Sequence, residues 1–147
     1  MPILGLGIDI IHLPRLHALL TRHPPAKFTH RILSTCERLA LLSEFPTLSL
    51  NTPLPKHSCG FAGLDAGERR LVAYLGARWA VKEAAFKAMY PVYTLRWPDV
   101  AVVKTKGKPY LILDPAIAKA TNVCSSHVSM SHDGEYAYAQ VIFETPP

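Results

Sequence analysis

The sequence predicts an α+β fold in which a long central helix packs on a small antiparallel sheet. The chain opens with a short apolar segment, and residues 77–89 then form a helical run without glycine or proline. After Pro91 the apolar period becomes that of strands, and glycine-containing turns separate them. A strand, then helices, then an antiparallel meander indicates a single α+β domain spanning residues 1–147.

The first strand is expected over residues 2–11, which are apolar and become β-branched towards the end. We expect both faces of this strand to be buried. Gly5 and Gly7 lie two residues apart, so they share one face and let another backbone approach closely. Asp9 follows on the same face. It either caps the next turn or serves a metal or phosphate, and the rarity of buried aspartate favours the second interpretation.

Three helical segments should follow the strand. Pro14 suits the first turn of a helix that runs to about Arg22. A second helix is predicted at about residues 26–33, and the capping-box pattern at residues 34–37 predicts the start of a third. A Pro/Gly-rich insertion at about 45–67 comes next, which we interpret as a surface excursion.

The long central helix, expected from about residue 66 to Tyr90, carries its charges in unusual positions. At about 100° per residue, Lys82 projects into the middle of an apolar side, and Glu83 and Lys87 lie at its edge. The opposite side is a strip of alanines that allows close packing. The helix should therefore be covered on more than one side, and charges are buried only when they are paired or bound to a metal or ligand. The pattern alone leaves both a structural ion network and a functional site open.

The C-terminal part of the chain should form the antiparallel strands. Tight turns are expected at Gly107 and at the Asp133-Gly134 pair. A short helix is predicted at about 115–120, and strands are predicted at about 99–104, 109–113, 127–132 and 135–143.

The composition is that of a globular protein, because 49% of residues are hydrophobic and 18% are charged. No apolar run approaches the length of a membrane span. Three cysteines without CxxC or zinc spacing indicate an intracellular protein and not a secreted one. The cytoplasm and the mitochondrial matrix both stay open as its compartment. The net charge of +5 is concentrated between Leu13 and Cys36, where there is no acid. An anionic partner is therefore expected, which could be nucleic acid, an acidic protein or a small molecule.

Two carboxylates from different elements could meet beside lysines. Asp9 ends a strand, and Glu83 lies on the long helix with Lys87 one turn further on. Mg²⁺ takes one or two carboxylates and completes its octahedron with water and phosphate oxygens. Lysines neutralise the charge that phosphoryl transfer gathers on oxygens. No Walker loop, dinucleotide fingerprint or kinase motif set is present, so the sequence predicts a Mg²⁺–phosphate site of another kind.

Motifs spread over nearly the whole chain resemble those of one family. They are G-x-D at 7–9 with Arg15, the segment 31–33 with Glu37, W-x-x-K-E-A-x-x-K at 79–87, the turn 107–110 and the strand 128–133. In this order they resemble the holo-acyl-carrier-protein synthases, the small 4′-phosphopantetheinyl transferases. The insertion at about 45–67 departs from the compact members of that family, in which this link is much shorter.

The resemblance implies a reaction in which a serine hydroxyl of an apo acyl carrier protein attacks the pyrophosphate of CoA. The carrier gains 4′-phosphopantetheine, adenosine 3′,5′-bisphosphate leaves, and the product supports fatty acid synthesis. By resemblance, Asp9 and Glu83 ligate Mg²⁺. Lys87 stabilises the leaving phosphate, and Lys82 helps to hold the phosphates. The adenine and 3′-phosphate are framed by Gly107, Lys108, Pro109, Ser129, Ser131 and His132. The general base stays open between a metal-bound water, Glu83 and Asp133.

The resemblance also gives the basic segment a partner, because carrier proteins are acidic. Arg15, Arg22 and Arg31 are placed to meet the carrier, and nucleic acid is not implied. Larger relatives hold two copies of the unit, so a single copy implies a homotrimer with sites between subunits. The alternative is a non-catalytic module that docks nucleic acid or an acidic protein through residues 13–31. A single-strand binder needs stacking rings among its basic residues, and this segment offers only Phe28.

Overall fold

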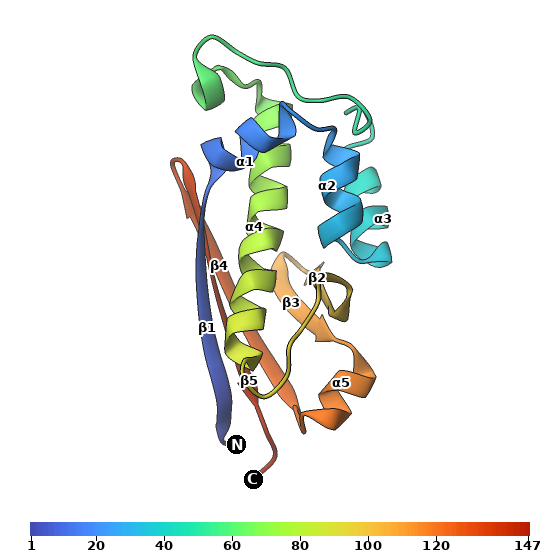
Figure 1. The fold of residues 1–147 in the computed structure, drawn as a ribbon, viewed down its shortest axis with the longest axis vertical. Helices are drawn as coiled ribbons and strands as arrows, with labels where there is room; N and C mark the ends of the chain where they lie inside the picture. Colours follow the sequence, from blue (N-terminus) through green and yellow to red (C-terminus); the bar gives the residue numbers. More distant parts are fainter.

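The computed structural model describes all residues, 1–147, and shows a long helix lying along one face of a three-stranded antiparallel sheet (Figure 1). The strands are β1 (Ile3–His12), β4 (Ser125–Asp133) and β5 (Tyr136–Glu144), in the order β1-β5-β4. The helix is α4 (Ala66–Met89). The first strand therefore pairs with the last, and the two termini lie close together at one end of the molecule (Figure 1). The predicted α+β class is confirmed.

Helix α4 approaches β1 closely because glycines of the strand face alanines of the helix. A Cβ atom on Gly5 would lie 1.9 Å from the carbonyl oxygen of Ala88, and one on Gly7 would lie 1.9 Å from that of Ala84. Any side chain here would push the two elements apart. The predicted glycine-cleared face and alanine strip are confirmed, and the close contact brings Asp9, next on the same face, beside α4.

The other face of β1 is open in a single chain. Leu6, Ile8 and Ile10 are between 44% and 62% exposed. The expectation that β1 is buried on both faces is therefore wrong for one chain. Register pairs these three residues with Ile142, Gln140 and Tyr138 of β5, which continue the same outer face. Monomeric proteins rarely expose a wide apolar patch, so this face has the character of an interaction surface.

Three helices gather beside the N-terminal part of α4 (Figure 1). They are α1 (Leu13–Leu20), α2 (Pro25–Ile32) and α3 (Thr35–Glu44). The predicted capping box of α3 is present, with Ser34 and Glu37 bonding each other's backbone N–H groups. Asp65 and Glu68 form a second capping box at the start of α4. No helix of the structure has the length and apolar character needed to cross a membrane.

A hairpin of β2 (Val100–Thr105) and β3 (Lys108–Leu113) forms a second, two-stranded sheet. It is preceded by a 3₁₀ turn, Trp97–Asp99, and followed by α5 (Pro115–Ala120). The predicted turn is confirmed, and it requires positive φ angles of 50° at Lys106 and 81° at Gly107. The sheet, the hairpin and the C-terminal half of α4 enclose one apolar cluster, whereas α1, α2, α3 and the N-terminal half of α4 enclose another.

Most residues of the insertion at 45–67 are exposed at the surface, and a few apolar side chains anchor it to the rest of the fold. Leu54, Phe61 and Leu64 are buried in the core beneath α1 and the start of α4. The backbone N–H of Leu54 donates to the carbonyl of Leu20 at 2.9 Å. A 3₁₀ turn at Gly60–Gly63 places the Phe61 ring inward. The insertion stays ordered because its few apolar side chains cover helix ends that would otherwise be exposed.

Candidate active site

A hollow at the junction of β1, α1 and α4 brings the two predicted metal ligands together. Its volume is about 430 Å³. The polar and aromatic side chains that line it are Asp9, His12, Arg15, Arg22, Trp79 and Glu83. Asp9 comes from the end of β1 and Glu83 from the middle of α4, so the close glycine–alanine packing of these two elements creates the pair.

The two carboxylates of the hollow interact with each other and with Lys87. Lys87 Nζ donates to Asp9 Oδ1 at 2.8 Å and to the backbone carbonyl of Ile8 at 2.9 Å. Burial raises the pKa of Glu83, the negative charge of Asp9 raises this pKa further, and Lys87 lowers it. The two acids therefore lie close enough to repel each other, and one lysine compensates them in part.

This donor set suits one kind of metal. No group of three or more His, Cys, Asp or Glu side chains is placed to hold an ion. Structural and catalytic zinc sites use three or four such ligands. Mg²⁺ is commonly held by only one or two carboxylates together with water and substrate phosphates. The pair of Asp9 and Glu83, with mutually repelling charges, fits Mg²⁺ bound to an anionic substrate.

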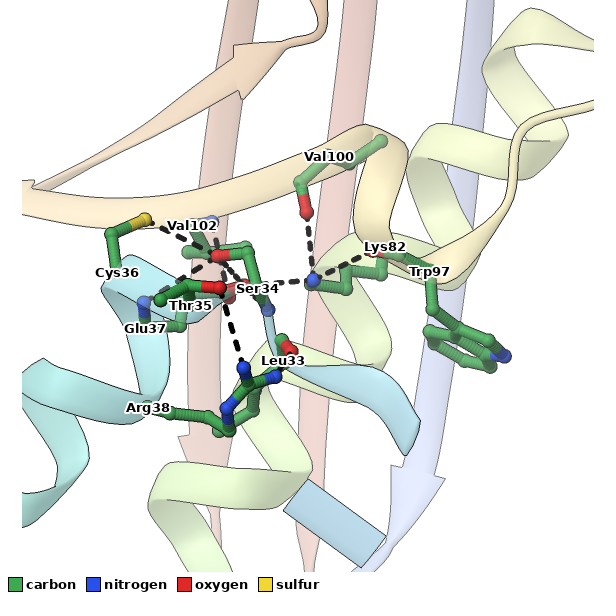
Figure 2. Close-up of polar contacts among 10 residues, drawn as sticks. All are labelled: Leu33, Ser34, Thr35, Cys36, Glu37, Arg38, Lys82, Trp97, Val100 and Val102. Atoms are coloured by element: carbon green, nitrogen blue, oxygen red, sulfur yellow. Dashed lines mark hydrogen bonds and ion pairs between the residues drawn. The ribbon is translucent and has the colours of Figure 1, made fainter. Parts of the chain in front are cut away.

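Lys82 lies outside this hollow, and its predicted role in holding phosphates is contradicted. Its Nζ atom lies 2.8 Å from Glu37 Oε2 and donates to the carbonyls of Val100 at 2.7 Å and Trp97 at 3.0 Å (Figure 2). The side chains of Lys82 and Glu37 are both 0% exposed. Three acceptors use all three N–H groups of the ammonium, which leaves none for a ligand. For this lysine the structural ion network is the correct interpretation.

Glu37 completes the buried network, and the sequence pattern revealed only its capping role. Its Oε2 accepts from the backbone N–H of Ser34 at 2.8 Å, and its Oε1 accepts from that of Val102 at 3.1 Å. One carboxylate thus links α3, α4 and β2 (Figure 2). Burial lowers the pKa of Lys82, and the charge of Glu37 opposes that shift.

Arg78 is a candidate functional residue that the sequence did not lead us to expect. It is buried, its guanidinium carbon lies 3.4 Å from the centre of the Tyr74 ring, and its Nε has no hydrogen-bond partner. A buried donor without a partner costs stability unless an acceptor reaches it. Arg78 lines a hollow of about 230 Å³ with Lys104, on the side of α4 that faces α3 and β2. The only signal in the sequence was its position directly before Trp79, where the family motif begins.

The remaining predicted site residues do not line the first hollow in a single chain. Ser129 and Ser131 pair in register with Gln140 and Tyr138 on the outer face of the sheet, and His132 pairs with Ala137 on the other face. They are exposed, as is Arg31 on α2, and the turn with Lys108 belongs to the separate hairpin. The residues expected at the adenine and 3′-phosphate, including Gly107, Lys108 and Pro109, are thus separate from Asp9 and Glu83.

A comparison with known proteins identifies the family to which this arrangement belongs. The sequence model of the 4′-phosphopantetheinyl transferase superfamily matches residues 5–141. The chain belongs to this superfamily. The matched range contains both the Asp9 strand and the Glu83 helix, and the prediction made from their motifs is confirmed.

Among the relatives of this transferase is the holo-[acyl-carrier-protein] synthase of Streptomyces coelicolor, which is 36% identical over 98% of this chain and 99% of its own. The mitochondrial 4′-phosphopantetheinyl transferase B of Aspergillus fumigatus is 34% identical over 95% of this chain and 92% of its own. The solved holo-(acyl-carrier-protein) synthase of Bacillus anthracis, in complex with CoA (3′,5′-ADP), superposes with a TM-score of 0.65. It is 31% identical, and the match covers 98% of both chains. The predicted enzyme class, a phosphopantetheinyl transferase, is confirmed.

Proposed function

We propose that this transferase moves 4′-phosphopantetheine from CoA to a serine of an apo acyl carrier protein, and that it requires Mg²⁺. The observation that carries the proposal is the meeting of Asp9 and Glu83 beside Lys87, at the family's two motifs, in a hollow that arginines border. The relatives named as carrier-protein synthases, and the structure that contains CoA, support the substrates.

Each side chain of the hollow has a defined task in this proposal. Asp9 and Glu83 would hold Mg²⁺, which supplies Lewis-acid activation and a template for the CoA pyrophosphate. Lys87 is 54% exposed beside Asp9, so its ammonium can turn to a phosphate and stabilise the charge that develops on the leaving group. Trp79 closes the side of the hollow with an apolar ring, which limits access of water.

The carrier protein would approach over α1. Arg15 and Arg22 line the hollow itself, so an acidic carrier bound to them would present its serine beside Asp9 and Glu83. Arg31 lies exposed on α2, where it extends the basic surface away from the hollow. Product carriers would serve fatty acid synthesis, and we propose the cytoplasm or the mitochondrial matrix as the compartment, since relatives include a mitochondrial enzyme.

The distribution of the predicted CoA residues supports a homotrimer with sites between subunits. Ser129 and Ser131 lie on the same sheet face as the exposed Leu6, Ile8 and Ile10. A second copy on this face would cover the apolar side chains and bring residues of one chain to the hollow of another. The Arg78 guanidinium, whose Nε has no hydrogen-bond partner, lies beside Lys104 and offers a further place for a phosphate of CoA. Light scattering tests this assembly, and a monomer of full activity would contradict it.

The decisive experiment is intact-mass measurement of an apo acyl carrier protein after incubation with the enzyme, CoA and Mg²⁺. We expect the mass of one phosphopantetheine to be added. Asp9→Ala and Glu83→Ala should lower the rate by about 10³-fold, in line with loss of transition-state charge stabilisation, while the fold survives. Glu144→Ala, on a carboxylate that pairs with His127 and does not line the hollow, is the matched control. Unchanged transfer by either variant would contradict the metal assignment.

A further inference from the structure

The chain contains three histidine–glutamate pairs, and only one of them borders the active-site hollow. His57 pairs with Glu68 at the start of α4, and His127 pairs with Glu144 at the far end of the sheet. His12 Nε2 lies 3.3 Å from Glu135 Oε2, and His12 lines the hollow with Asp9 and Glu83. The three pairs share the same chemistry, so their different positions allow a controlled comparison.

The His12 ring is held in place from three directions. His12 is the last residue of β1 and the N-cap of α1, so its backbone is fixed at both ends. Its ring packs against Tyr136 with 5.0 Å between the ring centroids. The backbone N–H of Leu13 donates to the carbonyl of Glu135 at 2.7 Å, which ties the β4–β5 turn to this junction. The contact with Glu135 occupies Nε2 and leaves Nδ1 without a protein partner.

We propose that His12, oriented by Glu135, accepts the proton of the carrier serine during transfer. The inference rests on the proposed function. As the serine Oγ forms its bond to the phosphorus of the phosphopantetheine, the Oγ–H proton passes to His12 Nδ1. The bond from that phosphorus to the bridging oxygen breaks, and adenosine 3′,5′-bisphosphate leaves with its electron pair. Glu135 stabilises the imidazolium that forms, as a carboxylate does for a catalytic histidine.

The charged groups around His12 suit this task. Glu135 faces it from the β4–β5 turn, Asp9 and Glu83 face the hollow from β1 and α4, and Arg15 and Arg22 face it from α1. Glu135 is the carboxylate in direct contact with the ring, so it is placed to stabilise a positive charge that forms there during the reaction. Histidine changes charge between about pH 5 and 8, which suits a base at neutral pH.

The other candidate bases are less well placed. Glu83 repels Asp9 and belongs with it to the proposed metal pair. Asp133 is exposed at the end of β4 and does not line the hollow. His12 is free of both objections, and it stands at the start of α1, the helix whose Arg15 and Arg22 would receive the carrier.

The test compares His12→Gln and His12→Ala with His57→Gln in the full-length enzyme at saturating Mg²⁺, because the His57–Glu68 pair lies away from both the hollow and the outer face of the sheet. We expect kcat to fall about 10²-fold in both His12 variants, the usual contribution of a general base, with KM for CoA and carrier unchanged. The acidic limb of the kcat–pH profile should disappear. Added imidazole should restore part of the activity of His12→Ala, an effect that a packing defect would not show. His57→Gln should behave as the wild type.

Three outcomes would overturn the inference. They are wild-type kcat in both His12 variants, a raised carrier KM at unchanged kcat, which would make His12 a docking residue, and failure of imidazole to restore any activity in a His12→Ala protein with an unchanged melting temperature. Failure of the wild-type enzyme to modify the carrier is a different result, because it would contradict the proposed function itself.

Discussion

Lys82 and Lys87 lie on the same helix, five residues apart, and the structure gives them opposite surroundings. Lys82 is 0% exposed and has one carboxylate and two carbonyls around its ammonium (Figure 2). Lys87 is 54% exposed and binds Asp9 at the edge of an open hollow. On the Lys82 side the protein satisfies the charge completely, which leaves nothing to bind. On the Lys87 side two carboxylates share one exposed ammonium, so their charges are only partly compensated and the site can still bind a cation and an anionic substrate.

The largest expected effect is the loss of stability when the fully paired Lys82 is replaced. Lys82→Met should lower the free energy of unfolding by about 3–5 kcal/mol, because it leaves the Glu37 carboxylate buried without its counter-charge. Lys87→Met should change stability by no more than about 1 kcal/mol, since an exposed ion pair contributes little. Urea unfolding followed by circular dichroism measures both values.

A second substitution separates the charge effect from lost packing. Adding Glu37→Gln to Lys82→Met removes the unpaired charge and keeps an amide oxygen that can accept from Ser34 and Val102. The double variant should therefore recover part of the lost stability. A double variant that is less stable than Lys82→Met alone would show that desolvated charge is not the cause.

A smaller loss of stability is expected where β1 and α4 meet. The surroundings of Lys82 and of Lys87 both depend on that contact. Gly7→Ala places a Cβ atom 1.9 Å from the Ala84 carbonyl oxygen, and the two elements must separate. Overpacking of this kind costs about 1–3 kcal/mol, and transfer should fall as Asp9 moves from Glu83. Gly67→Ala, in the first turn of α4, meets only the Asp65 side chain at 3.3 Å and is the control. Equal melting temperatures for the two variants would contradict the close-contact argument.

The sequence predicted those parts of the site whose positions follow from the periodicity within a single strand or helix. The two-residue period of β1 put Asp9 on the glycine face, and the helical period put Glu83 and Lys87 at the edge of α4. The same period put Lys82 towards the interior, but its partner Glu37 is distant in the chain and lies on another helix. Which charges meet across elements depends on tertiary packing, which residue spacing within one element does not encode.

The same limit explains the anchoring of the insertion, which the sequence did not reveal, and the correction at β1. The insertion at 45–67 has the composition of a loop, and its anchoring to the core rests on separate apolar side chains such as Leu54, Phe61 and Leu64, which have no regular spacing. The apolar outer face of β1 was read as buried because the strand is apolar on both sides, and one chain supplies a cover for only one side. A pattern of apolar residues identifies surface to be covered, and it does not say whether the same chain covers it.

The smallest expected effect is a change in melting temperature at Glu83, in the open hollow beside Lys87. The pKa of Glu83 is raised above its ordinary value of 4.5 by burial and by Asp9, so the folded protein favours the protonated acid. The stabilising contribution of that acid is present below the unfolded-state pKa and is lost as the pH rises through the raised value. At pH 7 the metal-free Glu83→Gln variant should therefore melt slightly above the wild type, and this difference should shrink as the pH falls towards 5.

Mg²⁺ should raise the melting temperature of the wild type and leave that of Glu83→Gln unchanged. The rise should be smaller at pH 5 than at pH 8, because protonation of Glu83 competes with the metal. Thermal melts with and without Mg²⁺ measure these shifts, with Glu144→Gln as a control that keeps the Mg²⁺ response. A Glu83→Gln protein with the full Mg²⁺ response would show that the ion binds elsewhere and that the repulsion between Asp9 and Glu83 serves another ligand.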